Sequence, residues 1–299
     1  MSDVLSKAQP LQKRAIKDRN AFLMSIVSMP LVIRLCATWV VIVLLIAFSA
    51  DWIAPYSYSQ LDLLARLTPP VFLGGDAAHW LGTDELGRDV LSRLIFSVRI
   101  SLLVAFTSTL LSALVGVLMG FAAAHFRGWV EQLVLTLVDF QASMPFMIVA
   151  LAVLAFFGNT LPLFIALMGF YGWERSARIS RGLTIAANEQ GYAAAVYDLG
   201  ASPWRVYVLH ILPNIASTLI VSVTLTFPEV ILLESGLSFL GLGVQPPMTS
   251  LGNMVGYGRE YLQTAPWILL APSFFIVATT FSVSMLGDWL RDLLDPTLT

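Results

Sequence analysis

The sequence contains little charge and almost no cysteine or lysine for its length. Only 12% of its 299 residues are charged, about half of the proportion found in soluble domains. The single cysteine, Cys36, has no partner for an internal disulfide, and we interpret it as a small core residue. All three lysines, Lys7, Lys13 and Lys17, precede the first apolar run. No basic face of the kind that binds nucleic acid is therefore expected.

Motifs of nucleotide-binding and hydrolytic proteins are also missing. The chain has no G-x-x-x-x-G-K-[ST] loop, so it lacks that route to ATP binding. It has no nucleophile elbow and no H-E-x-x-H motif. His79, His125 and His210 are not at metal-ligand spacing, which argues against a metal site. We expect no catalytic residue and no cofactor in this chain.

Apolar residues make up 57% of the sequence, and the mean hydropathy is +0.79. This composition is typical of a polytopic membrane protein. A spanning helix needs about 20 apolar residues, and the runs predict an all-α protein with about six transmembrane helices. No cleavable signal peptide is expected, because mixed and polar residues precede the first run. The predicted spans are about Leu35–Ile53, Ile100–Ala124, Ser143–Phe157 (extended by Val134–Gln141), Leu161–Ala177, Ile215–Leu237 and Trp267–Trp289.

Small residues are spaced four apart in the second predicted span. Ser112, Gly116 and Gly120 would lie on one face of a helix, where small side chains let a second helix approach closely.

Arginine and lysine are distributed unequally between the two sides of these spans. With the N-terminus inside, twelve lie on the cytoplasmic side, Arg175 among them, and five lie on the other side. This bias predicts that both termini are cytoplasmic. The expected organisation is a cytoplasmic tail at 1–30, a first span with a long outside segment at 31–99, a transmembrane core at 100–290 and a cytoplasmic tail at 291–299.

Two outside segments are long. The first is Ala54–Arg99. Because Pro-Pro and Gly-Gly pairs are typical of loops, we expect Tyr56–Ala78 to be extended. We expect Asp89–Arg99 to form a helix that leads into the second span. Ser238–Pro266 is apolar enough to dip back toward the membrane. The acids and arginine of the first segment could suggest catalysis, but we interpret them as ion pairs that tie the loop together: Asp84, Glu85, Arg88 and Asp89.

A polar interruption, Ala186–Asn214, lies between two apolar spans on the cytoplasmic side. A helix beginning at Asn188 would place an apolar stripe on one face, formed by Tyr192, Ala195, Val196 and Leu199. Gly200 can end that helix in a left-handed conformation. Ser202-Pro203 can begin a second helix, which we expect Pro213 to end. The pattern predicts a helix–turn–helix, and an ordinary structured loop remains the alternative.

The same segment resembles the EAA loop of ATP-binding-cassette (ABC) importer permeases. The matching positions are Ala194-Ala195-Val196, then Gly200, then the run His210-Ile211-Leu212-Pro213-Asn214. Ala194 stands where the family has glutamate, so the usual charged contact is missing. Glu189 and Asp198 are nearby negative charges.

Further motifs are similar to the dipeptide, oligopeptide and nickel permeases of that family, specifically their C-type subunit. They are Trp80–Asp89 (WLGTDELGRD) with Ser92-Arg93 and Arg99–Leu102, Leu237–Pro247 (LSFLGLGVQPP), and Leu286–Pro296 (LGDWLRDLLDP). Ser97 replaces a glycine usual in the family. The resemblance covers about residues 30 to 297.

The resemblance implies a type I ABC importer permease fold in the bacterial inner (plasma) membrane. It implies a heterodimer with a homologous B-type permease, two cytoplasmic ATPases that use ATP and Mg, and a periplasmic binding protein that delivers peptides or related small solutes. By position, the ATPase-coupling residues are Tyr192, Ala194, Ala195, Leu199, Gly200, Ala201, Arg205, His210 and Pro213. The matching periplasmic residues are Gly82, Thr83, Asp84, Gly87, Arg88, Asp89 and Arg93.

Two acids fall inside the fifth predicted span. Glu229 and Glu234 would be costly in lipid, so each faces either the translocation path or a hydrogen-bonded helix interface. Glu229 beside Pro228 also keeps open a secondary transporter driven by an ion gradient. An intramembrane enzyme, the other alternative, lacks a catalytic constellation. The sequence leaves the solute open among peptides, nickel chelates, glutathione-like compounds and sugar-derived ligands.

Overall fold

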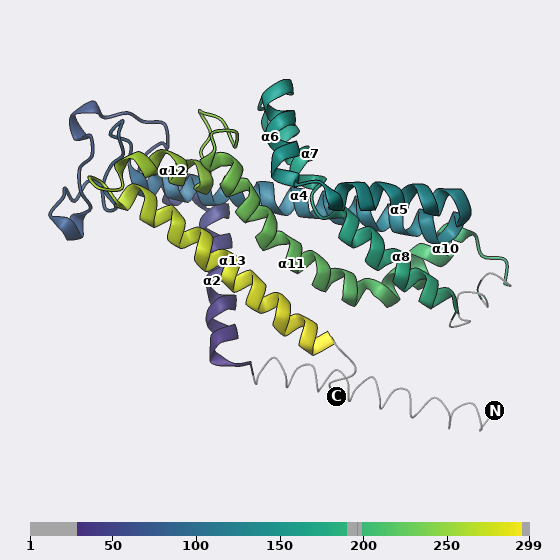
Figure 1. Ribbon diagram of the computed structural model, residues 1–299. Coiled ribbons are helices and arrows are strands. Elements are labelled where there is room, and N and C mark those ends of the chain that lie inside the picture. The colour runs from purple at the N-terminus through teal and green to yellow at the C-terminus, as the bar shows by residue number, and fades with distance from the viewer. Residues whose placement is uncertain (1–28, 190–195, 197–198, 295–299) are drawn as a thin grey trace.

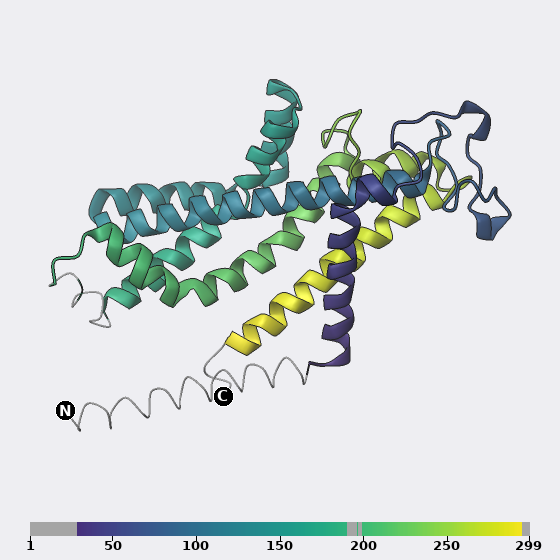
Figure 2. The same ribbon diagram turned by 180° about the vertical axis from the view of Figure 1, so that it is seen from behind.

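The computed structural model describes residues 29–189, 196 and 199–294. Within these residues, the backbone forms helices, turns and one isolated bridge between Thr83 and Asp89. Figures 1 and 2 show long helices packed at angles to one another, with the loops before α4 (Val90–Phe126) at one end of that helix and α10 (Pro203–Val206) near its other end. The expected coupling residues Tyr192, Ala194 and Ala195 lie outside the described residues.

Four helices among the described residues are long and apolar enough to cross a membrane. They are α2 (Leu31–Phe48), α4 (Val90–Phe126), the continuous stretch Pro203–Phe239 that ends in α11 (Leu212–Phe239), and α13 (Trp267–Leu294). A bent pair, α5 (Gly128–Ser143) with α6 (Phe146–Phe157), makes a fifth if it counts as one span. The all-α fold is confirmed, whereas the prediction of about six spans is not.

The start of α4 follows the sequence prediction. The Asp89 side chain accepts a hydrogen bond from the Ser92 backbone N–H and caps the helix. The helix expected over Asp89–Arg99 then continues without a break through the second predicted span. At 37 residues and 1.5 Å per residue, α4 is about 55 Å long. It therefore reaches well beyond the thickness of a bilayer.

The third and fourth predicted spans are each broken. Pro145 ends α5, because a residue before proline is driven to an extended conformation, and the axes of α5 and α6 differ by 90°. With 12 residues, α6 is too short to span a bilayer by itself. The fourth run divides into α7 (Leu161–Gly169) and α8 (Trp173–Glu189), with Gly172 at φ +81° between them. The predicted helix start at Asn188 is wrong, because that residue lies in the last turn of α8.

Pro213 does not end the second cytoplasmic helix, contrary to the prediction. The chain runs as α10 (Pro203–Val206), a π-helical segment (Tyr207–Ile211, η3 in the element order) and α11 without interruption. Proline removes a backbone donor and crowds the preceding turn. A wider π turn directly before it relieves that crowding. The cytoplasmic helix is therefore continuous with a membrane span.

The glycine face of α4 packs directly against α8, as the four-residue spacing predicts. A Cβ atom built on Gly116 would lie 2.6 Å from the Trp173 carbonyl oxygen, and one built on Gly120 would lie 2.6 Å from the Ala177 carbonyl oxygen. Both distances are far below van der Waals contact, so any side chain at these positions would separate the two backbones. The Ser112 hydroxyl donates to the Tyr171 carbonyl oxygen at 2.7 Å and fixes the register at the α7–α8 turn.

The outside segments are more structured than expected. The stretch predicted to be extended contains two 3₁₀ turns, η1 (Leu63–Ala65) and η2 (Val71–Leu73). A four-residue helix, α3 (Ala50–Ile53), precedes it. In the second segment, α12 (Leu251–Gly258) packs against α4, α11 and α13, and the 3₁₀ turn η4 (Arg259–Tyr261) follows it.

Replacement of Gly120 by alanine tests the α4–α8 contact. Overpacking typically costs about 1–3 kcal/mol of the free energy of unfolding, so Gly120→Ala is expected to lower the thermal unfolding midpoint of the purified protein in detergent. Gly182 in α8 is the matched control, because a Cβ there meets nothing within 4 Å. Gly182→Ala is expected to leave the midpoint unchanged or to raise it. Equal midpoints for the two variants would contradict the close packing.

Candidate functional site

Gly200 forms the turn that precedes α10. Its φ is +86°, and a Cβ built on it would meet nothing within 4 Å. The Ala201 N–H donates to the Val196 carbonyl oxygen at 3.3 Å across this residue. That bond and the left-handed glycine are the features of a Schellman helix end. Gly200 therefore has the helix-ending conformation that the sequence predicts, and it lies in open space.

The helix after this turn is fixed to the rest of the protein by a buried apolar cluster. Ser202 occupies the N-cap position and Pro203 the first helical turn, as predicted, although the serine side chain makes no capping bond. Figure 1 shows α10 beside the end of α8. The cluster joins α8, α10 and α11 through Ala187, Val206, Tyr207, Ile211, Ile215 and Leu219, with Val117 and Phe121 of α4 packed against it.

The opposite face of the turn is exposed and apolar. The Leu199 side chain is 87% exposed, and the Trp204 side chain is 69% exposed. Arg205 and Pro213 are also exposed, whereas His210 is half-buried. Trp204 was not among the predicted site residues, although a tryptophan in the first turn after Pro203 is a signal that sequence reasoning could have used. A large apolar side chain held in water beside an open turn is typical of a surface that binds another protein.

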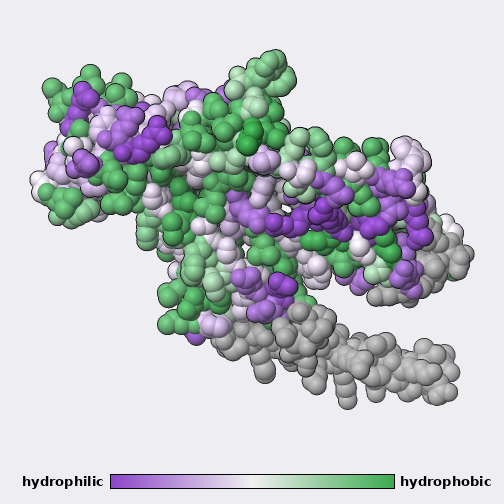
Figure 3. All heavy atoms as spheres, in the orientation of Figure 1, coloured by the Kyte–Doolittle hydropathy of each residue, from purple (hydrophilic) through white to green (hydrophobic). Residues whose placement is uncertain are grey.

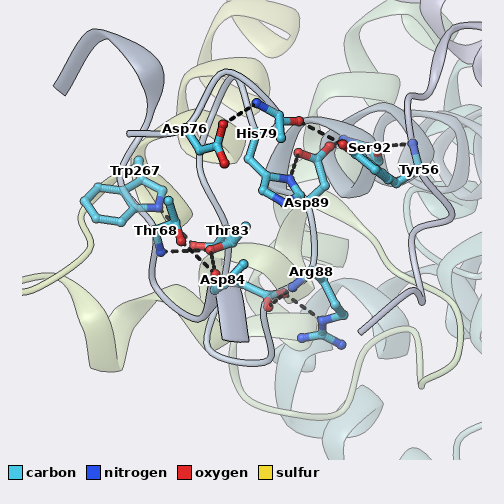
Figure 4. A network of polar contacts seen from close by, with 12 residues as sticks. Tyr56, Thr68, Asp76, His79, Thr83, Asp84, Arg88, Asp89, Ser92 and Trp267 are labelled. Atoms are coloured by element: carbon cyan, nitrogen blue, oxygen red, sulfur yellow. Dashed lines mark hydrogen bonds and ion pairs between the residues drawn. The ribbon is translucent and has the colours of Figure 1, made fainter. Parts of the chain in front are cut away.

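In the periplasmic motif, Asp84 is the centre of a buried ion-pair network (Figure 4). Its carboxylate accepts from Arg88 Nε at 2.7 Å, from Arg93, and from the Leu86 and Arg88 backbone N–H groups at 2.9 Å. Glu85 accepts from Arg88 Nη2 at 2.8 Å. The network confirms the interpretation of these charges as ion pairs that tie the outside segment together. A buried carboxylate with this many donors orders the loop around it.

Asp89 belongs to a second contact, which the sequence analysis did not predict. Its Oδ1 lies 3.0 Å from His79 Nδ1, and its Oδ2 accepts from the Ser92 hydroxyl at 2.7 Å. The Ser92 hydroxyl also accepts from the Tyr56 backbone N–H at 3.0 Å. In Figure 4, Asp89 contacts His79 of the loop on one side and Ser92 at the start of α4 on the other. In the described part of the chain, no three histidine, cysteine or acidic residues are grouped to hold a metal ion.

The two outside segments are joined into one surface. Trp267 Nε1 donates to the Thr83 carbonyl oxygen at 3.1 Å, and the Ser97 hydroxyl lies 2.8 Å from that of Thr249. Gly82 and Gly87 occupy turns with φ of +78° and +72°. A cavity of about 300 Å³ lies between the segments and is lined by residues of both: Tyr58, Glu85, Arg88, Arg93, Pro246 and Tyr257 among them.

Glu234 lies in a helix junction rather than on an open face. Its side chain is fully buried and accepts from the Ser238 hydroxyl at 2.7 Å and the Ser101 hydroxyl at 3.2 Å. The Ser101 hydroxyl in turn accepts from the Leu251 backbone N–H at 3.0 Å. Glu234 therefore connects α11 with α4 and the start of α12, which is the hydrogen-bonded alternative of the sequence analysis.

Glu229 is different, because its side chain is half-exposed and paired with a cation. Its Oε1 lies 3.1 Å from Arg175 Nη1, and its Oε2 accepts from the Tyr171 hydroxyl at 3.2 Å. Arg175 was counted as a cytoplasmic residue, yet the structure pairs it with an acid 17 residues into α11. The next two arginines of α8 also pair with acids, Arg178 with Asp139 and Arg181 with Glu131. These two acids of α5 are thus part of an ion-pair row.

Comparison with known proteins places this architecture in a family. Residues 112–299 match the family described as "binding-protein-dependent transport system inner membrane component". The chain is 36% identical over 261 residues to a di/tripeptide transport system permease protein, DppC, of Pseudomonas aeruginosa, with 87% of this chain and 86% of that protein covered. It is 33% identical over 260 residues to a glutathione transport system permease protein, GsiD, of Pectobacterium atrosepticum, with 87% and 85% covered.

The fold has a counterpart among solved structures as well. The inward-facing MetNI methionine ABC transporter contains a chain that is similar with a TM-score of 0.54 at 18% identity, covering 69% of this chain and 98% of that one. At this identity the likeness concerns the fold alone. The helices, the family match and the extent of the identity to its relatives lead to one conclusion: the chain belongs to the family of inner-membrane components of binding-protein-dependent transport systems.

Proposed function

We propose that this chain is the C-type permease subunit of an ABC importer for short peptides or related small solutes. The observation that carries the proposal is the open Gly200 turn, which presents Leu199 and Trp204 to water and is continuous with α11. The names of the relatives, di/tripeptide and glutathione permeases, support the solute class.

The chain supplies the path and its partners supply the energy. Two cytoplasmic ATPases bind ATP and Mg, and each docks on a permease subunit; a homologous B-type permease completes the path. Both termini of this chain are cytoplasmic in this arrangement, as the distribution of lysine and arginine predicts. Shape and apolar area stabilise the docking contact, because Ala194 occupies the position of the glutamate in the EAA loop that this segment resembles.

Transport follows from movement of the docked turn. ATP binding brings the ATPases together and displaces the Gly200 turn. The helix Pro203–Phe239 is continuous and is fixed to α8 and α4 by the buried cluster. Displacement of the turn therefore moves these helices together and opens the path toward the outside, where the binding protein releases its solute. Such a movement is a population shift between two packings, driven by the energy of ATP binding.

The joined outside segments receive the binding protein. The Asp84 network holds the first segment in a single conformation, and the contact between Thr83 and Trp267 attaches it to α13. A pre-ordered surface loses little conformational entropy when a partner docks.

A secondary transporter would use a broken helix or an acid at mid-membrane to bind its coupling ion. The feature that kept this reading open was Glu229 beside Pro228. In the structure, α11 continues through Pro228 without a break, and Glu229 pairs with Arg175 and Tyr171. The unbroken helix favours the ABC importer.

Reconstituted transport decides between these two functions. We expect vesicles that contain both permeases and both ATPases to accumulate a labelled dipeptide only when ATP and the loaded binding protein are present. Replacement of the phosphate-binding lysine in the ATPases is the control and should abolish uptake. Uptake that continues without the ATPases, driven by an ion gradient, would refute the proposed function.

Gly200→Arg tests the docking turn. A bulky charge on the open turn should prevent ATPase docking, so that the ATPases no longer co-purify with the permeases. Gly241→Arg is the matched control, because Gly241 also has φ +86° and open space around it but lies in the outside segment. The backbone strain is the same in both variants, so ATPase co-purification should be lost in Gly200→Arg alone. Normal co-purification of Gly200→Arg would contradict docking at this turn.

Asp84→Asn tests the outside surface. Loss of one partner from a buried ion pair costs about 3–5 kcal/mol, which should disorder the segment and reduce the ATP hydrolysis that the loaded binding protein stimulates. Basal hydrolysis should not change. Asp51→Asn removes an exposed partner of Arg99 instead and should have no effect on either rate. Full stimulation of Asp84→Asn would show that the network does not support docking.

A further inference from the structure

The row of ion pairs along α8 begins close to the level of the middle of the predicted span Ile100–Ala124. The Ser112 hydroxyl bonds the Tyr171 carbonyl oxygen, and a Cβ built on Gly172 would lie 3.1 Å from Thr226 Cγ2. Ser112 is the midpoint of the predicted span Ile100–Ala124. The turn before α8 and the middle of α11 are therefore level with the centre of that span, and Arg175 and Glu229 lie within one helical turn of this level.

The pair is also exposed on the surface of this chain. The Arg175 side chain is 47% exposed and that of Glu229 is 35% exposed. A charged side chain at the centre of a bilayer is costly. An exposed pair at this depth is therefore not expected to contact lipid tails, and it faces either a water-filled path or the partner permease. Figure 3 shows a hydrophilic band that runs across the region of α5 and α8 between apolar surfaces.

The hydrogen-bonding capacity of the pair is not used up. A guanidinium has five N–H donors and a carboxylate has about four acceptor positions. Among the described residues, Arg175 donates to Glu229 through Nη1, and each Glu229 oxygen accepts one bond. The site can therefore accept an additional ammonium group and an additional carboxylate.

We infer that Arg175 and Glu229, with Tyr171, form a station in the translocation path that binds the two charged ends of a zwitterionic solute. The inference rests on the proposed function. The carboxylate of the solute binds Arg175, and its ammonium group binds Glu229. Half-exposed ion pairs contribute little to stability, so separating Arg175 from Glu229 to admit the solute costs little. The solute is then released as the path closes and the pair forms again.

Cysteine accessibility tests whether the pair faces the path. The chain has one cysteine, so a Cys36→Ser background is free of thiols. In the complete transporter in vesicles, Glu229→Cys should react with a charged, water-soluble methanethiosulfonate reagent, and saturating dipeptide should slow that reaction. Leu110→Cys is the control, because Leu110 is an exposed apolar residue of α4 at nearly the same depth as Ser112. An unreactive Glu229→Cys would place the pair against the partner permease and overturn the inference.

Transport per ATP hydrolysed provides the second measurement. Loss of one hydrogen bond to a charged group costs about 1.5–3 kcal/mol, so Arg175→Gln and Glu229→Gln should each lower dipeptide uptake by at least about tenfold. Hydrolysis stimulated by the loaded binding protein should continue. Arg178→Gln is the matched control, since it removes the neighbouring ion pair to Asp139, and it should transport like the unmodified chain.

The possible results separate the inference from the proposed function. If the unmodified transporter shows no ATP-dependent uptake, the proposed function itself fails. If the unmodified transporter works and Arg175→Gln and Glu229→Gln match it, the station is refuted while the proposed function stands. A parallel loss of uptake, stimulated hydrolysis and thermal stability would mean that the pair has a structural role, which also refutes the station.

Discussion

The contact on which the rest of the structure depends is the close approach of α4 and α8. Gly116 and Gly120 leave no side chain between the two backbones, and a single Cβ at either position would lie 2.6 Å from a carbonyl oxygen of α8. In a membrane, where apolar burial between helices provides little driving force, such backbone proximity is a main source of association. Because α8 leads directly into the cytoplasmic interruption, this contact sets the position of the Gly200 turn relative to the spans.

Three regions of different chemistry are aligned along this helix pair. At the outer end, the Asp84 network orders the segment that precedes α4. Near the middle, the turn before α8 positions Arg175 opposite Glu229. At the other end, the apolar cluster attaches the helix after Gly200 to α4 and α8. A protein without a site for ATP can use energy from its partners only if its ends are mechanically connected, and the α4–α8 pair provides that connection.

The sequence predicted the elements that depend on local chemistry and failed where distant residues decide. The helix over Asp89–Arg99, the left-handed Gly200 and the small-residue face of α4 follow from residues within a few positions of each other. Pro213 was predicted to end a helix. The structure accommodates it through a π-helical turn, which depends on packing against α4 and α8 and therefore could not be recognised from the local sequence. The pairing of Arg175 with Glu229 joins residues 54 positions apart, so counting arginines along the sequence could not reveal it. Ser97 contacts Thr249 across 152 positions, which no local pattern indicates.

The central claim is that α4, α8 and the Gly200 turn move as one body when the ATPases close. The most direct measurement is the distance between spin labels at Leu114 of α4 and at Leu199, both exposed, in the Cys36→Ser background of the complete transporter. The account predicts the same Leu114–Leu199 distance without nucleotide and with ATP bound, while the distance from Leu199 to the corresponding turn of the partner permease shortens. A Leu114–Leu199 distance that changes as much as the distance between the subunits would contradict it.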